Sequence, residues 1–190
     1  MIVARTAELA EERLNAGTMR CPRCGGQLIR WGFARPRTVR SHGNATVQLT
    51  PRRVRCCDCR ETHIVLPAAF QPRLADTTAA IAEALLYKAN GFGYRRIAAE
   101  LGRAESTVRR WLRRATSSHA HWLYQQGVQR LIQVAPEAFA ELRLGVNPIR
   151  DALSVLAAAA HWDRRRFGFP DSPWTLIGTY TCGRLLAPSG

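Results

Sequence analysis

The chain has 190 residues, a length that suits one or two compact domains and excludes a large multidomain machine. Hydrophobic residues make up 46% of the sequence and charged residues 22%, a globular balance that argues against global disorder. The formal net charge is +14, from 28 Lys and Arg against 14 Asp and Glu. An excess of this size predicts a polyanionic partner.

No stretch of the sequence predicts a signal peptide or a membrane span. The longest nearly apolar run covers residues 152–160, whereas a spanning helix needs about 20 apolar residues. We therefore expect a soluble intracellular chain, in which thiols stay reduced. The six cysteines of such a chain favour metal binding over disulfides.

Shifts in composition divide the chain into four segments and predict a mixed, mainly α fold. The segments are an N-terminal helix, a cysteine-rich segment of short antiparallel strands, a helical unit and a mostly helical C-terminal region, over residues 1–17, 18–72, 76–115 and 116–190. Most of the net positive charge lies before residue 116. The sequence gives no role for the last segment.

An apolar stripe predicts that the first segment is helical. The stripe consists of Val3, Ala7, Ala10 and Leu14. Gly17 follows the stripe and is placed to end the helix. We therefore expect one short helix over residues 1–17.

Two C-x-x-C motifs in the second segment predict a four-cysteine metal site. Cys21 and Cys24 form the first motif, and Cys56 and Cys59 form the second. A two-residue spacing lets one tight turn point both sulfurs at one place, and two such turns complete the tetrahedral sulfur cage that zinc prefers. The residues between the motifs predict a hairpin with residues 41–44 at its tip. The segment therefore predicts a zinc ribbon with one structural Zn²⁺.

Other interpretations of the cysteine-rich segment stay open. A redox dithiol at Cys21 and Cys24 would need a surrounding βαβ unit, which the pattern does not predict. His63 could replace a ligand, although we interpret it as a strand or surface histidine, and Cys57 as a spare thiol outside the site. Four thiolates close the coordination shell of zinc, so we expect a stabilising role and no catalytic residue.

Residues 76–115 carry the pattern of three helices. Asp76 is expected to cap the first helix, which runs to Ala89. Gly102 is expected to make the turn between the second helix, over about 94–101, and the third, over about 105–115. The residues that recur at helical spacing on the inner faces are Ile97, Ala98, Leu101, Val108, Trp111, Leu112 and Ala115. This spacing predicts a tri-helical unit with its own core.

The outer face of the third helix in this unit carries polar and basic side chains. Ser106, Arg109, Arg110 and Arg113 are spaced so that they share one face. An α-helix fits the major groove of DNA, where guanidinium groups grip guanine or clamp phosphates. The candidate DNA-binding residues are Ser106, Thr107, Arg109, Arg110, Arg113, Arg95 and Arg96. The plain alternative is a solvated amphipathic helix whose arginines keep the protein soluble.

The stretch from Gly93 to Leu112 resembles the homeodomain-like helix-turn-helix of bacterial transposases, resolvases and related regulators. The stretch from Cys21 to Leu66 resembles the zinc ribbon that precedes such a unit in several insertion-sequence transposases. The chain as a whole resembles an uncharacterised family of small actinobacterial zinc-ribbon and helix-turn-helix proteins. Two kinds of position depart from the pattern. Gly93 and Ala104 stand where Ser or Thr caps are usual, and Arg60 follows the second C-x-x-C where Gly is usual.

The resemblance implies a zinc-containing, sequence-specific DNA-binding protein of the bacterial cytoplasm, associated with the nucleoid. It would be a transcriptional regulator or a transposase-derived protein without a catalytic domain. A transposase catalytic centre needs three metal-binding carboxylates on a sheet, within a fold of well over about 100 residues. The last segment has Asp151, Asp163 and Asp171 in a mostly helical stretch, so we interpret them as a helix-start charge and loop residues.

The expected partner is therefore double-stranded DNA, with no membrane, no small-molecule substrate and no enzymatic activity. Self-association into a homo-oligomer through the last segment is left open. Two alternatives also stay open. One is the DNA-recognition subunit of a transposition or recombination system, and the other is a zinc-ribbon RNA-binding module that uses the basic hairpin.

Overall fold

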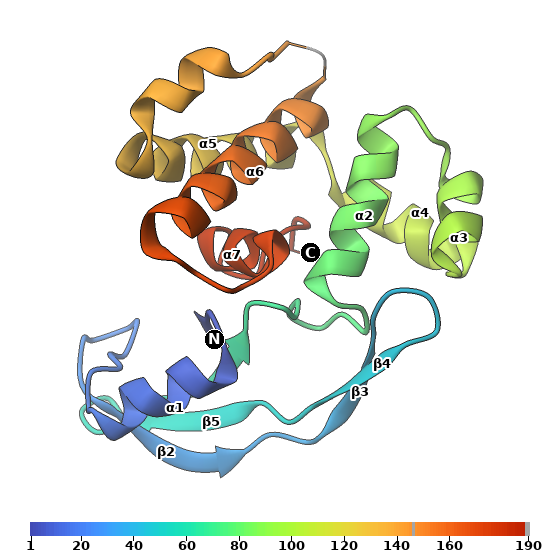
Figure 1. The fold of residues 1–190 in the computed structure, drawn as a ribbon. Helices are drawn as coiled ribbons and strands as arrows, with labels where there is room; N and C mark the ends of the chain where they lie inside the picture. The colour runs from blue at the N-terminus through green and yellow to red at the C-terminus, as the bar shows by residue number, and fades with distance from the viewer. Residues whose placement is uncertain (146, 189–190) are drawn as a thin grey trace.

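The computed structural model describes residues 1–145 and 147–188, and it gives a mixed fold that is about half helical with two small sheets (Figure 1). In chain order the elements are β1 (Ile2–Ala4), α1 (Ala7–Asn15), β2 (Leu28–Phe33), β3 (Arg37–Arg40), β4 (Thr46–Leu49), β5 (Arg52–Cys56), β6 (Thr62–Pro67), α2 (Thr78–Ala89), α3 (Tyr94–Leu101), α4 (Glu105–Arg114), α5 (Ser117–Val134), the 3₁₀ helix η1 (Pro136–Glu141), α6 (Pro148–Phe167) and α7 (Pro173–Tyr180). Among the described residues, no helix combines the length and the hydropathy that crossing a bilayer requires.

The prediction of one helix over residues 1–17 is wrong at its start. The first residues form β1, which pairs in parallel with β6 and places Ile2 opposite Val65. The Oγ1 atom of Thr6 accepts a hydrogen bond from the Leu9 N–H at 3.2 Å, so α1 begins only at Ala7. Gly17 has a φ of 64°, the left-handed conformation that suits the residue after a helix end.

A four-stranded sheet of order β1-β6-β5-β2 carries α1 on one face. Ala10 and Leu14 of α1 pack against Leu28, Val54 and Val65 of the sheet, and all five side chains are buried. Leu28, Val54 and Val65 share one face of the sheet, and burial of this apolar face requires a cover. The helix supplies that cover and completes a small core.

A long hairpin extends from this sheet toward the helical part of the molecule (Figure 1). Its inner strands β3 and β4 pair antiparallel with Val39 opposite Val47, and β2 and β5 continue them into the sheet. The Ser41 N–H donates to the Ala45 carbonyl at 2.7 Å and closes the tip. The hairpin, called the arm below, covers residues 28–56 and brings its tip beside α2, α3 and α4.

The start of α2 corrects a second prediction. Thr77, and not Asp76, caps this helix, because its Oγ1 accepts from the Ala80 N–H at 3.3 Å. Asp76 is 1% exposed and faces the interior. Its carboxylate is therefore available for contacts inside the protein.

Helices α2, α3 and α4 pack around one apolar cluster. Ile81 of α2, Ile97 of α3, and Val108 and Trp111 of α4 are each at most 1% exposed. Gly102, between α3 and α4, has a φ of 60° and makes the tight left-handed turn expected of it. Two residues of the predicted inner set are only half-buried, namely Leu112 and Ala115.

The C-terminal helices contribute to the core around α2 and also form a smaller cluster of their own, which includes Leu131 of α5 and Val155 of α6. Leu153 of α6 and Ile177 of α7 belong to the cluster that contains Ile81. The helices α5 and α6 cross closely at Gly127, where a Cβ atom would lie 2.9 Å from the Leu156 nitrogen. This segment therefore packs as a scaffold against α2.

The interpretation of Asp163 as a loop residue is wrong. It lies within α6, is 1% exposed, and accepts a hydrogen bond from the Arg130 Nε at 2.8 Å and another from the Tyr180 hydroxyl. Burial, together with the hydrogen bond to Asp163 and the charge of that carboxylate, raises the pKa of Tyr180 above its ordinary range, although Arg130 acts in the opposite direction. The carboxylate ties α5, α6 and α7 together.

Candidate metal centre and basic helix surface

The four cysteines of the two C-x-x-C motifs lie together at the end of the sheet. Their sulfur atoms all lie within 4.8 Å of one another. The Cys21 and Cys59 sulfurs are 3.7 Å apart, and those of Cys24 and Cys56 are 3.4 Å apart. Zinc with bonds of about 2.3 Å to four sulfurs separates them by roughly 3.8 Å. The cluster is therefore compatible with a tetrahedral metal ion, and the two motifs bring it together as predicted.

The two cysteine turns repeat one hydrogen-bonding pattern. The Cys21 N–H donates to the Gly26 carbonyl at 2.8 Å, and the Cys56 N–H donates to the Glu61 carbonyl at 2.9 Å. A bond from the Cys57 N–H to the Gln27 carbonyl, at 2.9 Å, holds the second turn against the chain that leaves the first. The backbone thus presents the thiols in two equivalent loops.

Each turn needs a left-handed residue directly after its second cysteine. Gly25 fills this position in the first turn with a φ of 77°, and Arg60 fills it in the second with a φ of 62°. Gly26 is required for space, because a Cβ atom there would lie 3.0 Å from the Cys56 sulfur and would collide with the Asp58 carboxylate. The first turn is therefore relaxed, whereas the second holds a non-glycine residue under backbone strain.

The thiols are poised unequally for ionisation. Burial opposes ionisation of Cys56, but the backbone N–H groups of Cys59 and Asp58 and the Cys24 thiol together lower the pKa of Cys56 to about 7. The Glu61 N–H favours the Cys59 thiolate, but burial and the neighbouring thiols raise the pKa of Cys59 to about 12. Ionisation of Cys56 is thus favoured over ionisation of Cys59, and thiolates packed this closely are stabilised by a nearby cation.

His63 contributes to this centre in a way that sequence reasoning missed. It lies on β6, as a strand histidine, but it is only 5% exposed, and its Nε2 lies 3.3 Å from the Cys21 sulfur. Its register partner Val54 faces α1, so the imidazole also points to the covered side of the sheet. The four sulfurs form the cluster without His63, which is placed to hydrogen-bond one of them from outside.

A buried ion pair fixes the tip of the arm to the helices. The Arg103 Nε lies 2.8 Å from the Asp76 Oδ1, and the two side chains are 3% and 2% exposed. Arg103 follows the left-handed turn after α3, and its guanidinium also donates to the Gly43 carbonyl at 2.8 Å and to the Ser41 carbonyl. A guanidinium in a buried place needs such a set of acceptors.

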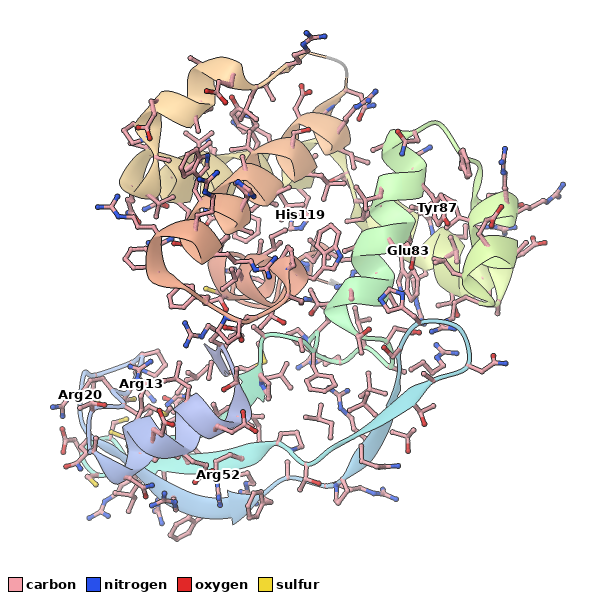
Figure 2. All side chains as sticks on the ribbon, viewed as in Figure 1. Arg13, Arg20, Arg52, Glu83, Tyr87 and His119 are labelled. Carbon is pink, nitrogen blue, oxygen red and sulfur yellow. The ribbon has the colours of Figure 1, made fainter. Side chains whose placement is uncertain are left out.

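Further contacts surround this pair. Arg40 of β3 donates to the second oxygen of Asp76 at 2.7 Å, and the Thr77 N–H donates to the Arg40 carbonyl at 2.9 Å. His42 at the tip lies 3.0 Å from the carboxylate of Glu83 on α2, which Figure 2 labels above the arm. The cysteine-held sheet and the helices α2 to α4 are therefore joined by a network of hydrogen bonds and ion pairs that no sequence motif predicts.

The outer face of α4 carries the basic side chains that the sequence placed there. Ser106, Arg109, Arg110 and Arg113 are exposed, and Thr107 is half-buried. In the part of the chain that the structure describes, the guanidinium groups of Arg110 and Arg113 form no ion pair and no hydrogen bond. These two charges are available to a partner.

The remaining basic residues of the predicted set have neighbours within the protein. Arg109 donates to the Tyr94 hydroxyl at 2.8 Å, and this contact lowers the pKa of Tyr94. The exposed side chains of Arg95 and Arg96 lie 3.8 Å from carboxylates, those of Glu105 and Glu100. Ion pairs on the surface are weak, so these arginines can exchange their partners for phosphates.

A family model described as "Domain of unknown function (DUF6431)" matches residues 21–111, slightly under half of the chain. Searches of curated proteins and of solved structures find no match. The matched span begins at Cys21 and ends at Trp111, so it contains the cysteine cluster, the arm, the Arg103–Asp76 pair and most of α4. The chain is similar to this family over the part in which these features are joined.

Proposed function

We propose that the protein is a zinc-containing, sequence-specific DNA-binding protein. In this proposal α3 and α4 act as a helix-turn-helix, and the cysteine-held sheet acts as a zinc ribbon. The protein would serve as a transcriptional regulator or as a transposase-derived binding protein without a catalytic domain. The observation that carries the proposal is the exposed row of Ser106, Arg109, Arg110 and Arg113 on α4.

The dimensions and the packing of α4 support this role. An α-helix with its side chains is about 10–12 Å in diameter, which fits the major groove of DNA, about 12 Å wide. The ten residues of α4 give it a length of about 15 Å along the groove. Val108 and Trp111 anchor the opposite face in the core at 0% and 1% exposure, so the row cannot turn inward without loss of the core. A rigid helix with unpaired guanidiniums suits guanine edges and phosphates.

The flanking basic residues support a backbone-contact role. Arg95 and Arg96 lie on α3, the helix before α4, and in helix-turn-helix proteins the first helix crosses the DNA backbone. Their charges would then add to affinity without adding sequence preference. The chain's net charge of +14 supplies a general attraction to the same polyanion.

Zinc would have a structural task in this proposal. Cys21, Cys24, Cys56 and Cys59 would hold one Zn²⁺ and leave no open coordination position for water or substrate. The gain would be stability for a sheet whose own core is small. We therefore propose binding, and not catalysis, as the activity of this chain.

The test begins with selection of bound sequences from a random duplex library, at stated salt, with metal-loaded full-length protein. The affinity for the selected duplex is then compared among wild type, R110A, R113A and the control R164A, which removes an exposed arginine of α6. Each α4 variant is expected to lose about 1–3 kcal/mol if it contacts a base, whereas R164A should bind as wild type does. Absence of a selected sequence, or equal affinity for all four proteins, would overturn the proposal.

A further inference from the structure

The four-stranded sheet has a second face that α1 does not cover. Strand register assigns the faces, because paired residues point to the same side. Leu28, Val54 and Val65 point toward α1. Ile29 and Arg55 are register partners, as are Arg53 and Ile64, and both pairs point away from α1. Together with Trp31, these four residues form a surface that is called the open face below. It consists of Ile29, Trp31, Arg53, Arg55 and Ile64.

A β-bulge places a tryptophan on the open face. Arg30 is opposite Val54, but the next registered pair is Phe33 with Arg52, so β2 holds one extra residue here. Gly32 sits in the bulge with a φ of 81°. Phe33 thereby lies on the α1 side against Arg52, whereas Trp31 stays with Arg55 on the other side.

The exposure of the open face is unusual for side chains of this kind. Trp31 is 47% exposed and Ile29 is 43% exposed. The Arg55 guanidinium lies over the Trp31 ring at 4.6 Å from its centroid and covers one side of the indole. Because Trp31 is nevertheless 47% exposed, part of its surface stays accessible to a planar group that can stack on the ring.

The charge around the open face selects a polyanion. Residues 25–57 contain seven arginines and no Asp or Glu. Arg30 and Arg52 pair with Glu11 of α1, but Arg53 and Arg55 form no ion pair with any residue that the structure describes. The Arg55 Nε donates to the Arg60 carbonyl at 3.3 Å, which leaves its charge without a counter-ion. Two guanidiniums without a counter-charge therefore lie on the same face as the exposed indole, a combination that fits alternating bases and phosphates better than an apolar protein surface.

We propose that the open face binds single-stranded DNA, with a base stacked on Trp31 and phosphates at Arg53 and Arg55. The bases of a duplex are stacked on one another and offer no free ring face, so the occupant has to be unpaired. The preference for DNA over RNA rests on the proposed function, since a strand that continues from the duplex held by α4 has the same backbone.

The experiment measures the anisotropy of labelled oligo(dT) of about 15 nucleotides with the metal-loaded full-length chain. W31A is expected to weaken binding by about 5- to 150-fold, the range for loss of one stacked base. F33A is the matched control, because Phe33 is 54% exposed on the same strand but lies on the α1 side. It should bind as wild type does.

Two further variants keep the test independent of folding. W31F retains a ring for stacking and should keep most of the affinity. R53A should reduce the slope of log affinity against log salt by about 0.7, the value for one phosphate contact on a single strand. Circular dichroism and metal content, measured on each variant, identify a folding defect.

Comparison with the selected duplex separates this proposal from the proposed function. W31A should leave duplex affinity unchanged, and R110A should leave oligo(dT) affinity unchanged. Equal affinity of W31A and F33A for oligo(dT), or no binding of oligo(dT) by wild type, would overturn the open face as a single-strand site. Binding of oligo(rU) as tightly as oligo(dT) would overturn the assignment to DNA.

Discussion

The cysteine-held sheet and the helical part of the molecule are stabilised in different ways. The sheet and α1 share a core of nine buried residues, and two of these are the cysteines Cys21 and Cys56. The helices α2 to α7 share a cluster of twenty buried residues, from Leu74 to Leu186. A small core needs a cross-link, whereas a large one does not. The two regions should therefore respond differently when the cysteine cluster is disturbed.

The junction between the two regions determines how far such a disturbance spreads. At this junction the Asp76 carboxylate forms ion pairs with Arg40 of the arm and with Arg103, which lies in the turn before α4. Because both Asp76 and Arg103 are buried, neither can turn to water when the other is lost. The position of the arm therefore depends on its contacts with the helical part as well as on the sheet.

The largest expected effect is the loss of a cysteine from the cluster. C56S, or treatment with a chelator, should destabilise the sheet region by about 5 kcal/mol or more, because metal binding supplies folding free energy to such sites. Most of the helical circular dichroism should remain. The measurement is a thermal melt followed by circular dichroism, with and without chelator.

C57S is the matched control for this variant, because Cys57 is the neighbouring cysteine outside the cluster. It should melt as wild type does. The distinction between the two regions would fail if C57S lost as much stability as C56S. It would also fail if the helical signal and the sheet signal disappeared together in both variants.

The next effect is expected at the junction. D76N should cost about 3–5 kcal/mol, because it leaves the Arg103 guanidinium buried without its counter-charge. Chemical denaturation of the full chain measures the free energy of unfolding. E83Q is the control, since the contact of Glu83 with His42 is exposed and should contribute less than about 1 kcal/mol. Similar losses for D76N and E83Q would show that the junction is no more important than a surface contact.

A smaller effect is expected from crowding inside the first cysteine turn. G26A should destabilise the chain by about 1–3 kcal/mol, because the new methyl group meets the Asp58 carboxylate and the Cys56 sulfur. The metal-to-protein ratio should fall in parallel, since the clash displaces one of the four sulfurs. Wild-type stability with full metal content would contradict the tight packing of the two turns.

The smallest effect is a gain. R60G should stabilise the sheet region by about 0.5–1 kcal/mol, because relief of the left-handed strain at Arg60 exceeds the added chain entropy of glycine. R73G tests the same backbone relief outside the cysteine turns, since Arg73 has a φ of 57°. A loss of stability in R60G with a gain in R73G would mean that the Arg60 side chain itself supports the second turn.

Local signals predicted much of this structure. The helices over Tyr94–Leu101 and Glu105–Arg114 match their predicted bounds to within one residue, and Gly102 makes the expected turn between them. The C-x-x-C spacing brought the four sulfurs together, and helical periodicity identified the exposed row on α4. In each case a few neighbouring residues carry the information.

Features that depend on a distant partner were not predicted. The strand at residues 2–4 exists because β6 lies beside it, and a run of three residues gives no strand signal of its own. Local sequence predicts a helix cap for Asp76 and a loop position for Asp163, yet each is buried against an arginine far away in the chain. The residues next to a charged side chain in the sequence do not show whether a distant counter-charge will pair with it in the folded protein.

The most direct test of the account is native mass spectrometry of the full chain mixed with its selected duplex, because it reads metal and DNA on the same particle. We expect DNA-bound particles with one zinc per chain. We also expect that the double variant R110A/R113A retains its zinc and loses the duplex. DNA-bound chains without metal, or a double variant that still carries the duplex, would contradict it.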